Sequence, residues 1–89
     1  MVQVHVFYSG AVQGVGFRYT TQSLARRFDI AGWVKNLRDG RVELLAEGEQ
    51  EQISQFLKAI ADHFSHHIIE QKVESYPAQG QIKNFMIMG

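Results

Sequence analysis

The chain of 89 residues contains no cysteine and a single proline, Pro77. The absence of cysteine excludes disulfide bonds, thiolate catalysis and cysteine-ligated metals, and it is typical of proteins kept in a reducing cytoplasm. No apolar run approaches the roughly 20 residues that a membrane-spanning helix needs. The N-terminus also lacks the basic and apolar stretches of a signal peptide. We therefore expect one cytoplasmic domain, residues 1–89, with no membrane contact.

Net charge is absent as well, because nine Lys and Arg residues balance nine Asp and Glu residues. The charges are nevertheless segregated along the chain. Residues 1–41 carry six basic and two acidic side chains, whereas residues 42–89 carry three and seven. A basic segment can steer a small anion toward a site. The alternative is that these charges are simply solvated surface groups.

Low-complexity tracts, linkers and internal repeats are missing, and the apolar residues follow regular periods. The first strand alternates between two faces, and apolar residues at helical spacing follow Gly48 and end at Phe64. These patterns predict strands at Val2–Tyr8, Trp33–Arg38, Arg41–Ala46, Ile68–Tyr76 and Ile82–Met88, and helices at Phe17–Phe28 and after Gly48. Asp39-Gly40 predicts a two-residue hairpin turn. The order β-α-β-β-α-β, with an extra strand element near the end, predicts an α+β, ferredoxin-like sandwich. In that fold two helices cover one face of a mostly antiparallel sheet.

Three glycines, Gly10, Gly14 and Gly16, separate the first strand from the first helix, which opens with Arg18. A curled run of backbone N–H groups that leads into a helix N-terminus can cradle an anion. An arginine adds a planar fork that matches phosphate oxygens. The loop lacks the Gly-Lys-Ser/Thr of a nucleotide P-loop, and Tyr19 stands where a dinucleotide fingerprint needs Gly or Ala. The pattern favours a phosphate site over a merely tight turn.

Asn36 lies in an apolar strand, where asparagine is disfavoured. Its amide both donates and accepts hydrogen bonds, so it could orient a water molecule. The alternative is a local hydrogen bond at the strand end beside the hairpin. His63, His66 and His67 have the spacing of metal ligands on a continuous helix. We favour a solvated helix end for these histidines and expect no metal site.

Two segments, Gly-Ala-Val-Gln-Gly-Val-Gly-Phe-Arg at 10–18 and Gly-Trp-Val-Lys-Asn-Leu-Arg-Asp-Gly-Arg-Val at 32–42, resemble the acylphosphatase family. The resemblance implies an enzyme that hydrolyses the carboxyl-phosphate bond of acyl phosphates to carboxylate and inorganic phosphate, without metal or cofactor. It implies catalytic roles for Arg18, which binds the phosphoryl group, and for Asn36, which positions the attacking water. It also implies that the substrate phosphate is wrapped by the loop residues Ala11, Val12, Gln13, Gly14, Val15, Gly16 and Phe17.

Two other functions are compatible with this element order. The same loop could belong to a non-catalytic module that binds phosphate or a phosphorylated metabolite. An RNA-binding fold of the same topology needs aromatic residues on its third strand, and the predicted strand Arg41–Ala46 has none. Net neutrality also argues against a nucleic-acid partner. The resemblance implies a small-molecule acyl phosphate as the partner, and we expect the chain to act as a monomer.

Overall fold

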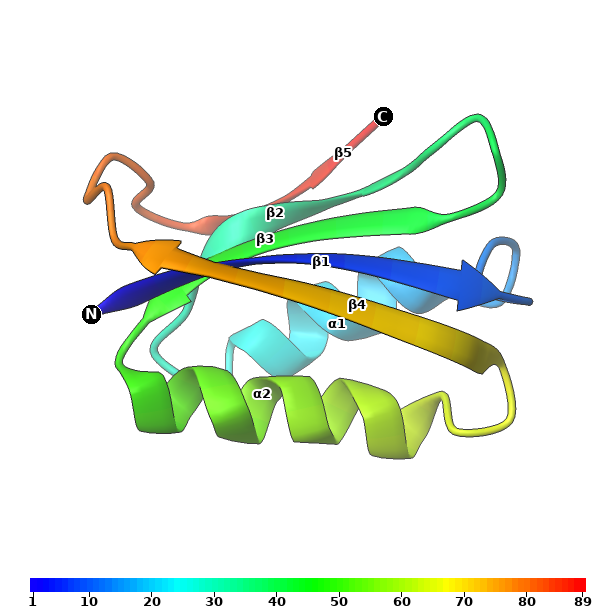
Figure 1. Ribbon diagram of the computed structural model, residues 1–89, viewed down its shortest axis with the longest axis horizontal. Helices are drawn as coiled ribbons and strands as arrows, with labels where there is room; N and C mark the ends of the chain where they lie inside the picture. Colours follow the sequence, from blue (N-terminus) through cyan, green and yellow to red (C-terminus); the bar gives the residue numbers. More distant parts are fainter.

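The computed structural model describes residues 1–89 and contains seven regular elements. These are β1 (Val2–Gly10), α1 (Phe17–Ala25), β2 (Ala31–Asn36), β3 (Val42–Gly48), α2 (Gln50–His63), β4 (Ile68–Pro77) and β5 (Phe85–Met88). The strands form one sheet in the order β4-β1-β3-β2-β5, and both helices cover the same face of it (Figure 1). The predicted ferredoxin-like sandwich is confirmed. Neither helix is long and apolar enough to cross a bilayer.

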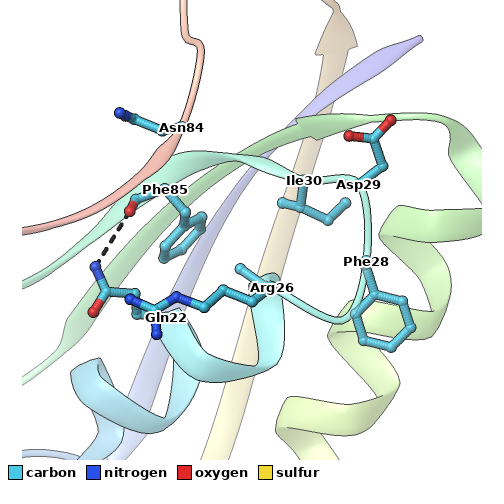
Figure 2. Close-up of a pocket in the computed structure, with 8 residues that line it drawn as sticks. Gln22, Arg26, Phe28, Asp29, Ile30, Asn84 and Phe85 are labelled. Atoms are coloured by element: carbon cyan, nitrogen blue, oxygen red, sulfur yellow. Dashed lines mark hydrogen bonds between the residues drawn. The ribbon is translucent and has the colours of Figure 1, made fainter.

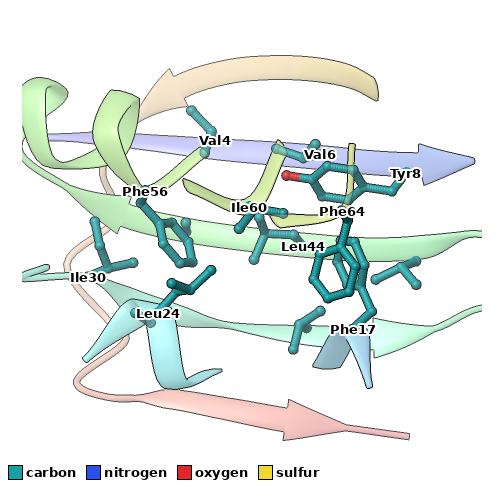
Figure 3. Packing of buried hydrophobic residues seen from close by; sticks show 14 of the residues in the cluster. Val4, Val6, Tyr8, Phe17, Leu24, Ile30, Leu44, Phe56, Ile60 and Phe64 are labelled. Atoms are coloured by element: carbon teal, nitrogen blue, oxygen red, sulfur yellow. The ribbon is translucent and has the colours of Figure 1, made fainter. Parts of the chain in front are cut away.

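The core lies between the sheet and the two helices and contains 16 buried apolar residues. Strand alternation turns Val4, Val6 and Tyr8 of β1 toward the helices, and the apolar stripe of α2 faces them (Figure 3). At one end of the core the ring of Phe17 lies 4.9 Å from that of Tyr8 and 4.5 Å from that of Phe64. Because Phe17 is the first residue of α1, this aromatic packing fixes where the helix begins.

The sheet topology brings the ends of β1 and β2 to the same edge. Both strands pair with β3 in the antiparallel sense, so they run parallel to each other. Tyr8 of β1 and Asn36 of β2 both pair with Val42 of β3. The loop that follows β1 and the hairpin between β2 and β3 therefore lie at one end of the molecule (Figure 1). β2 also pairs with β5, and this is the one parallel pair in the sheet.

Several predicted boundaries are wrong. α1 ends at Ala25 rather than Phe28, because the N–H groups of residues 26–28 donate to carbonyls three residues earlier, in a tighter turn than an α-helix. The hairpin has a three-residue loop, 38–40, instead of the predicted two-residue turn. The Leu37 N–H donates to the Arg41 carbonyl, and Gly40 donates back to Leu37. β2 accordingly ends at Asn36 rather than Arg38.

The last strand begins at Phe85 rather than Ile82. The connection that precedes it is held by a buried carboxylate. The backbone N–H groups of Gln79 and Gly80 donate to the carboxylate of Glu47, at 2.8 and 3.2 Å. This contact anchors the connection from β4 to β5 without extending the sheet.

Candidate active site

The loop from β1 to α1 borders a small hollow of about 100 Å³, termed here the loop hollow. Its lining residues are Val12, Gly14, Gly16, Phe17, Arg18, Tyr19 and Asn36. Gly14 and Gly16 have φ angles of 78° and 77°, which residues with a Cβ rarely adopt. A Cβ at either position would meet no atom within 4 Å. The backbone conformation, rather than lack of space, therefore requires glycine at both positions.

The backbone N–H groups around the loop hollow have no partners within the chain. None of those from Val12 to Tyr19 donates to a backbone carbonyl. Gly16 is the N-cap residue of α1, no side chain caps the helix, and its first turn holds no acidic residue. Free N–H groups at a helix N-terminus attract anions. Ala11 differs, because its N–H donates to the carbonyl of His67 at 2.9 Å.

Arg18 contributes the one charged side chain of the loop hollow. It lies in the first turn of α1 and is half-buried. Its Nη1 donates to the carbonyl oxygen of Gly89 at 3.0 Å, which holds the side chain against the end of β5. A guanidinium has five N–H donors, so most of them remain available to a ligand. No carboxylate lines this hollow to compete for them.

Asn36 reaches the loop hollow from the sheet. It is the last residue of β2 and shares the helix-facing side of that strand with buried Val34. Its Oδ1 is buried and has no hydrogen-bond partner. An unpaired buried acceptor costs about 1–3 kcal/mol, and a bound hydrogen-bond donor such as water would remove that cost. The structure thus brings Asn36 and Arg18, 18 positions apart in the sequence, to one hollow.

Three of the predicted loop residues, Ala11, Gln13 and Val15, do not line the hollow. Gln13 instead ties the loop to the hairpin. Its Nε2 donates to the carbonyls of Leu37, at 2.7 Å, and Arg41, at 2.9 Å. Sequence reasoning missed this role, because both acceptors are backbone atoms of the hairpin and carry no sequence signal. Both of these bonds fix the path of the loop.

Tyr19 was also missed by the sequence reasoning. It lines the loop hollow, and 68% of the residue is exposed. The only signal in the sequence is its place directly after Arg18 in the first turn of α1. An exposed aromatic ring beside the hollow offers a contact surface for an apolar or aromatic part of a ligand.

The basic residues of the first half of the sequence do not form one patch around the hollow. Lys35 pairs with Glu43, with Nζ 3.6 Å from Oε1, and Arg41 pairs with Asp39 at 2.8 Å. The Arg41 N–H and guanidinium hold the pKa of the Asp39 carboxyl below its usual value. Two of these cations are thus already compensated. The histidines of the chain also form no group of three or more side chains placed to hold a metal ion.

A larger hollow, of about 360 Å³, lies at the opposite end of α1 and is termed here the far hollow (Figure 2). Its lining residues are Gln22, Ala25, Arg26, Phe28, Asp29, Ile30, Asn84 and Phe85. None of them belongs to the two sequence motifs. Gln22 Nε2 donates to the Phe85 carbonyl at 3.3 Å (Figure 2), and the Asp29 carboxylate would repel a phosphate. The loop hollow is therefore the better anion site despite its smaller volume.

Comparison with known proteins identifies the family. Residues 4–87 match the acylphosphatase family profile. An acylphosphatase from Bacillus velezensis is 57% identical over 60 residues, which cover 67% of each chain. One from Bacillus pumilus is 38% identical over the whole length of both chains. The crystal structure of an acylphosphatase from Bacillus subtilis superposes over all of both chains with a TM-score of 0.92 and 38% identity. The chain belongs to the acylphosphatase family, whose members are enzymes that hydrolyse acyl phosphates.

Proposed function

We propose that the loop hollow is the catalytic site, in which the carboxyl-phosphate bond of an acyl phosphate is hydrolysed. The phosphoryl oxygens accept hydrogen bonds from the free backbone N–H groups between Val12 and Tyr19, and from the guanidinium of Arg18. The attacking water donates a hydrogen bond to Oδ1 of Asn36. The single observation that carries this assignment is the run of unpaired N–H groups around one hollow, together with an arginine and an unpaired amide oxygen.

The chemistry needs little more than positioning. The water oxygen forms a bond to phosphorus, the bond from phosphorus to the acyl oxygen breaks, and its electron pair leaves on the carboxylate. One water proton stays on the phosphate product, and the other passes to a phosphoryl oxygen or to solvent. Because a carboxylate is a good leaving group, no acid is required to protonate it. What remains is to hold the phosphoryl oxygens and align the water, which preorganised donors do well.

We also propose that residues 1–89 form one domain and that this domain acts as a monomer. Supporting this, the buried apolar residues belong to one cluster, and the loop hollow is lined by residues of a single chain. Equilibrium sedimentation over a range of concentrations tests the second point. A stable dimer with full activity only above its dissociation constant would contradict it.

The role of Arg18 is tested with benzoyl phosphate in the presence of a chelator, by measuring the release of benzoate and phosphate. We expect Arg18→Ala to lower kcat/KM by about a thousandfold, the upper range for the loss of one preorganised donor. Arg18→Lys should recover little, because a point charge does not replace a bidentate fork. Arg26→Ala is the matched control, since Arg26 is an exposed arginine at the other end of the same helix.

The role of Asn36 predicts a different kinetic pattern. Asn36→Ala should lower kcat about a hundredfold while leaving inhibition by inorganic phosphate nearly unchanged, because the amide contacts the water and not the phosphate. Loss of phosphate affinity with an unchanged kcat would contradict the water-positioning role. A folded wild-type chain that binds phosphate but releases no product would overturn the proposed catalytic site as a whole.

A further inference from the structure

A groove of about 260 Å³ runs along α1 beside the loop hollow and is termed here the helix groove. Its lining residues are Tyr19, Thr20, Ser23, Leu24, Arg27 and His63. Five of the six lie on one face of α1 and the turn that follows it, and His63 is the last residue of α2. Tyr19 lines both the helix groove and the loop hollow. The two depressions therefore meet at this exposed ring.

The helix groove presents hydrogen-bond donors and no carboxylate. Apart from Leu24, each lining side chain carries a hydroxyl, a guanidinium or an imidazole. The guanidinium of Arg27 makes no ion pair within the chain. The neighbouring carboxylate of Asp62 is already paired with Lys58 at 2.8 Å. A ligand that fits this groove would thus bring acceptors, and a negative charge would meet Arg27.

The direction of the leaving group connects the groove to the reaction. In a phosphoryl transfer the attacking and leaving oxygens lie roughly in line on opposite sides of phosphorus. Asn36 approaches the loop hollow from the sheet, so a water held by it would direct the leaving acyl group away from the sheet. The exposed ring of Tyr19 borders the same hollow from α1. Arg27 lies about 12 Å along the axis from Tyr19. Its long, flexible side chain can span part of the gap to a bound acyl group.

We propose that the helix groove holds the acyl part of the substrate and favours acyl groups that carry a second anionic group. This inference rests on the proposed function, because it requires the phosphoryl group to occupy the loop hollow. Tyr19 contacts the first atoms of the acyl group. Arg27 meets the distal anion, and the hydroxyls of Thr20 and Ser23 lie between them.

The test compares 4-carboxybenzoyl phosphate with 4-methylbenzoyl phosphate, two rigid substrates of similar size that differ in a distal negative charge. The measured quantity is the ratio of their kcat/KM values, in wild type and in Arg27→Gln. Comparing the variant with wild type cancels the intrinsic reactivity of each substrate. We expect Arg27→Gln to lower the ratio about three- to fivefold, the size of a solvent-exposed charge pair. The effect should weaken as salt is raised.

Arg26→Gln is the matched control, because it removes the same charge one residue earlier but lines the far hollow instead. An equal fall of the ratio in both variants would mean that only overall charge matters, and it would overturn the groove assignment. An unchanged ratio in Arg27→Gln would do the same. In both of these outcomes the proposed function still holds if the wild-type chain hydrolyses both substrates. If the wild-type chain hydrolyses neither substrate, both the proposed function and the groove assignment are refuted.

A second variant tests the direction of the acyl group without using charge. Tyr19→Ala should lower the preference for benzoyl phosphate over acetyl phosphate about three- to tenfold, because only the benzoyl ring is large enough to pack against the tyrosine ring. An unchanged preference would place the acyl group elsewhere. Thermal melting of each variant confirms that the chain is folded.

Discussion

The tether between Gln13 and the hairpin offers the sharpest test of how the site is held. The Nε2 of Gln13 donates hydrogen bonds to the backbone carbonyls of Leu37 and Arg41, at 2.7 and 2.9 Å. A neutral hydrogen bond contributes about 0.5–1.5 kcal/mol net, so Gln13→Ala should lower the free energy of unfolding by about 1–3 kcal/mol. Gln13→Glu should cost more than Gln13→Ala, because the new carboxylate has no donor and faces two carbonyl oxygens.

Urea denaturation measures this order of stability, and thermal melting checks it. For a domain of this size each 1 kcal/mol lowers the melting temperature by about 4–8 °C. The loss of activity should be larger than the fraction of unfolded chain accounts for. The loop that carries the free N–H groups would lose its anchor, and a misplacement of about 1 Å can cost a hundredfold in rate. We therefore expect kcat/KM for benzoyl phosphate to fall about ten- to hundredfold at a temperature where both variants are folded.

Gln71→Glu is the control for the added charge, because Gln71 is exposed on β4, away from the hairpin. This variant should match wild type in both stability and activity. If Gln13→Glu also unfolds at the wild-type urea concentration and hydrolyses benzoyl phosphate at the wild-type rate, the tether has no role and the reasoning is refuted.

Three further predictions follow from buried groups and from the loop. The hydroxyl of Tyr8 is buried without a hydrogen-bond partner, and burial raises the pKa of Tyr8. Tyr8→Phe should therefore stabilise the chain by up to about 1 kcal/mol in urea denaturation. A clear loss of stability would show that the hydroxyl has a partner. The Gln79 N–H in particular holds the pKa of the buried Glu47 carboxyl below its usual value. Glu47→Gln should therefore destabilise by about 1–2 kcal/mol at neutral pH. The difference should shrink as the pH falls below about 4.3, because the carboxyl of the unfolded chain takes up a proton there and that of the folded chain only at lower pH. An undiminished difference at about pH 3.5 would contradict that assignment. Gly14→Ala should lower the free energy of unfolding by about 1–2 kcal/mol, because alanine disfavours the left-handed backbone at this position. Val15→Ala is the control, at a partly exposed position outside the hollow, and should change the stability little. Equal unfolding midpoints for the two variants would argue against backbone strain at Gly14.

Much of the fold was predictable because the apolar residues of its strands and helices recur at regular spacing. The alternation of β1 and the apolar stripe of α2 each fix one buried face, and both faces are buried as predicted. The element order is confirmed in full. The parallel pairing of β5 with β2 was not predictable, because it joins segments about 50 residues apart through contacts with no local pattern. The early end of α1 was missed for a similar reason, since no glycine or proline marks it.

The candidate site was predictable only in part, for the same reason. Arg18 and Asn36 were predicted, and both line the loop hollow. The tether by Gln13 and the place of Tyr19 were not. Each depends on the path that the loop takes through space, and the acceptors of Gln13 are peptide carbonyls, which every residue possesses. Sequence patterns identify unusual side chains well, but they carry little information about which backbone atoms those side chains meet.

Most of the binding capacity assigned to the loop hollow resides in peptide N–H groups, which no substitution except proline can remove. Side chains act on such a site indirectly, by setting the path of the backbone. Gly14 and Gly16 permit the turn, Phe17 anchors the helix start in the core, and Gln13 holds the loop on the hairpin. The topology supplies the last condition, because β1 and β2 both flank β3 and so end at one edge. The two motifs are therefore brought together by the sheet itself, and in the proposed mechanism only Arg18 and Asn36 contribute side-chain chemistry.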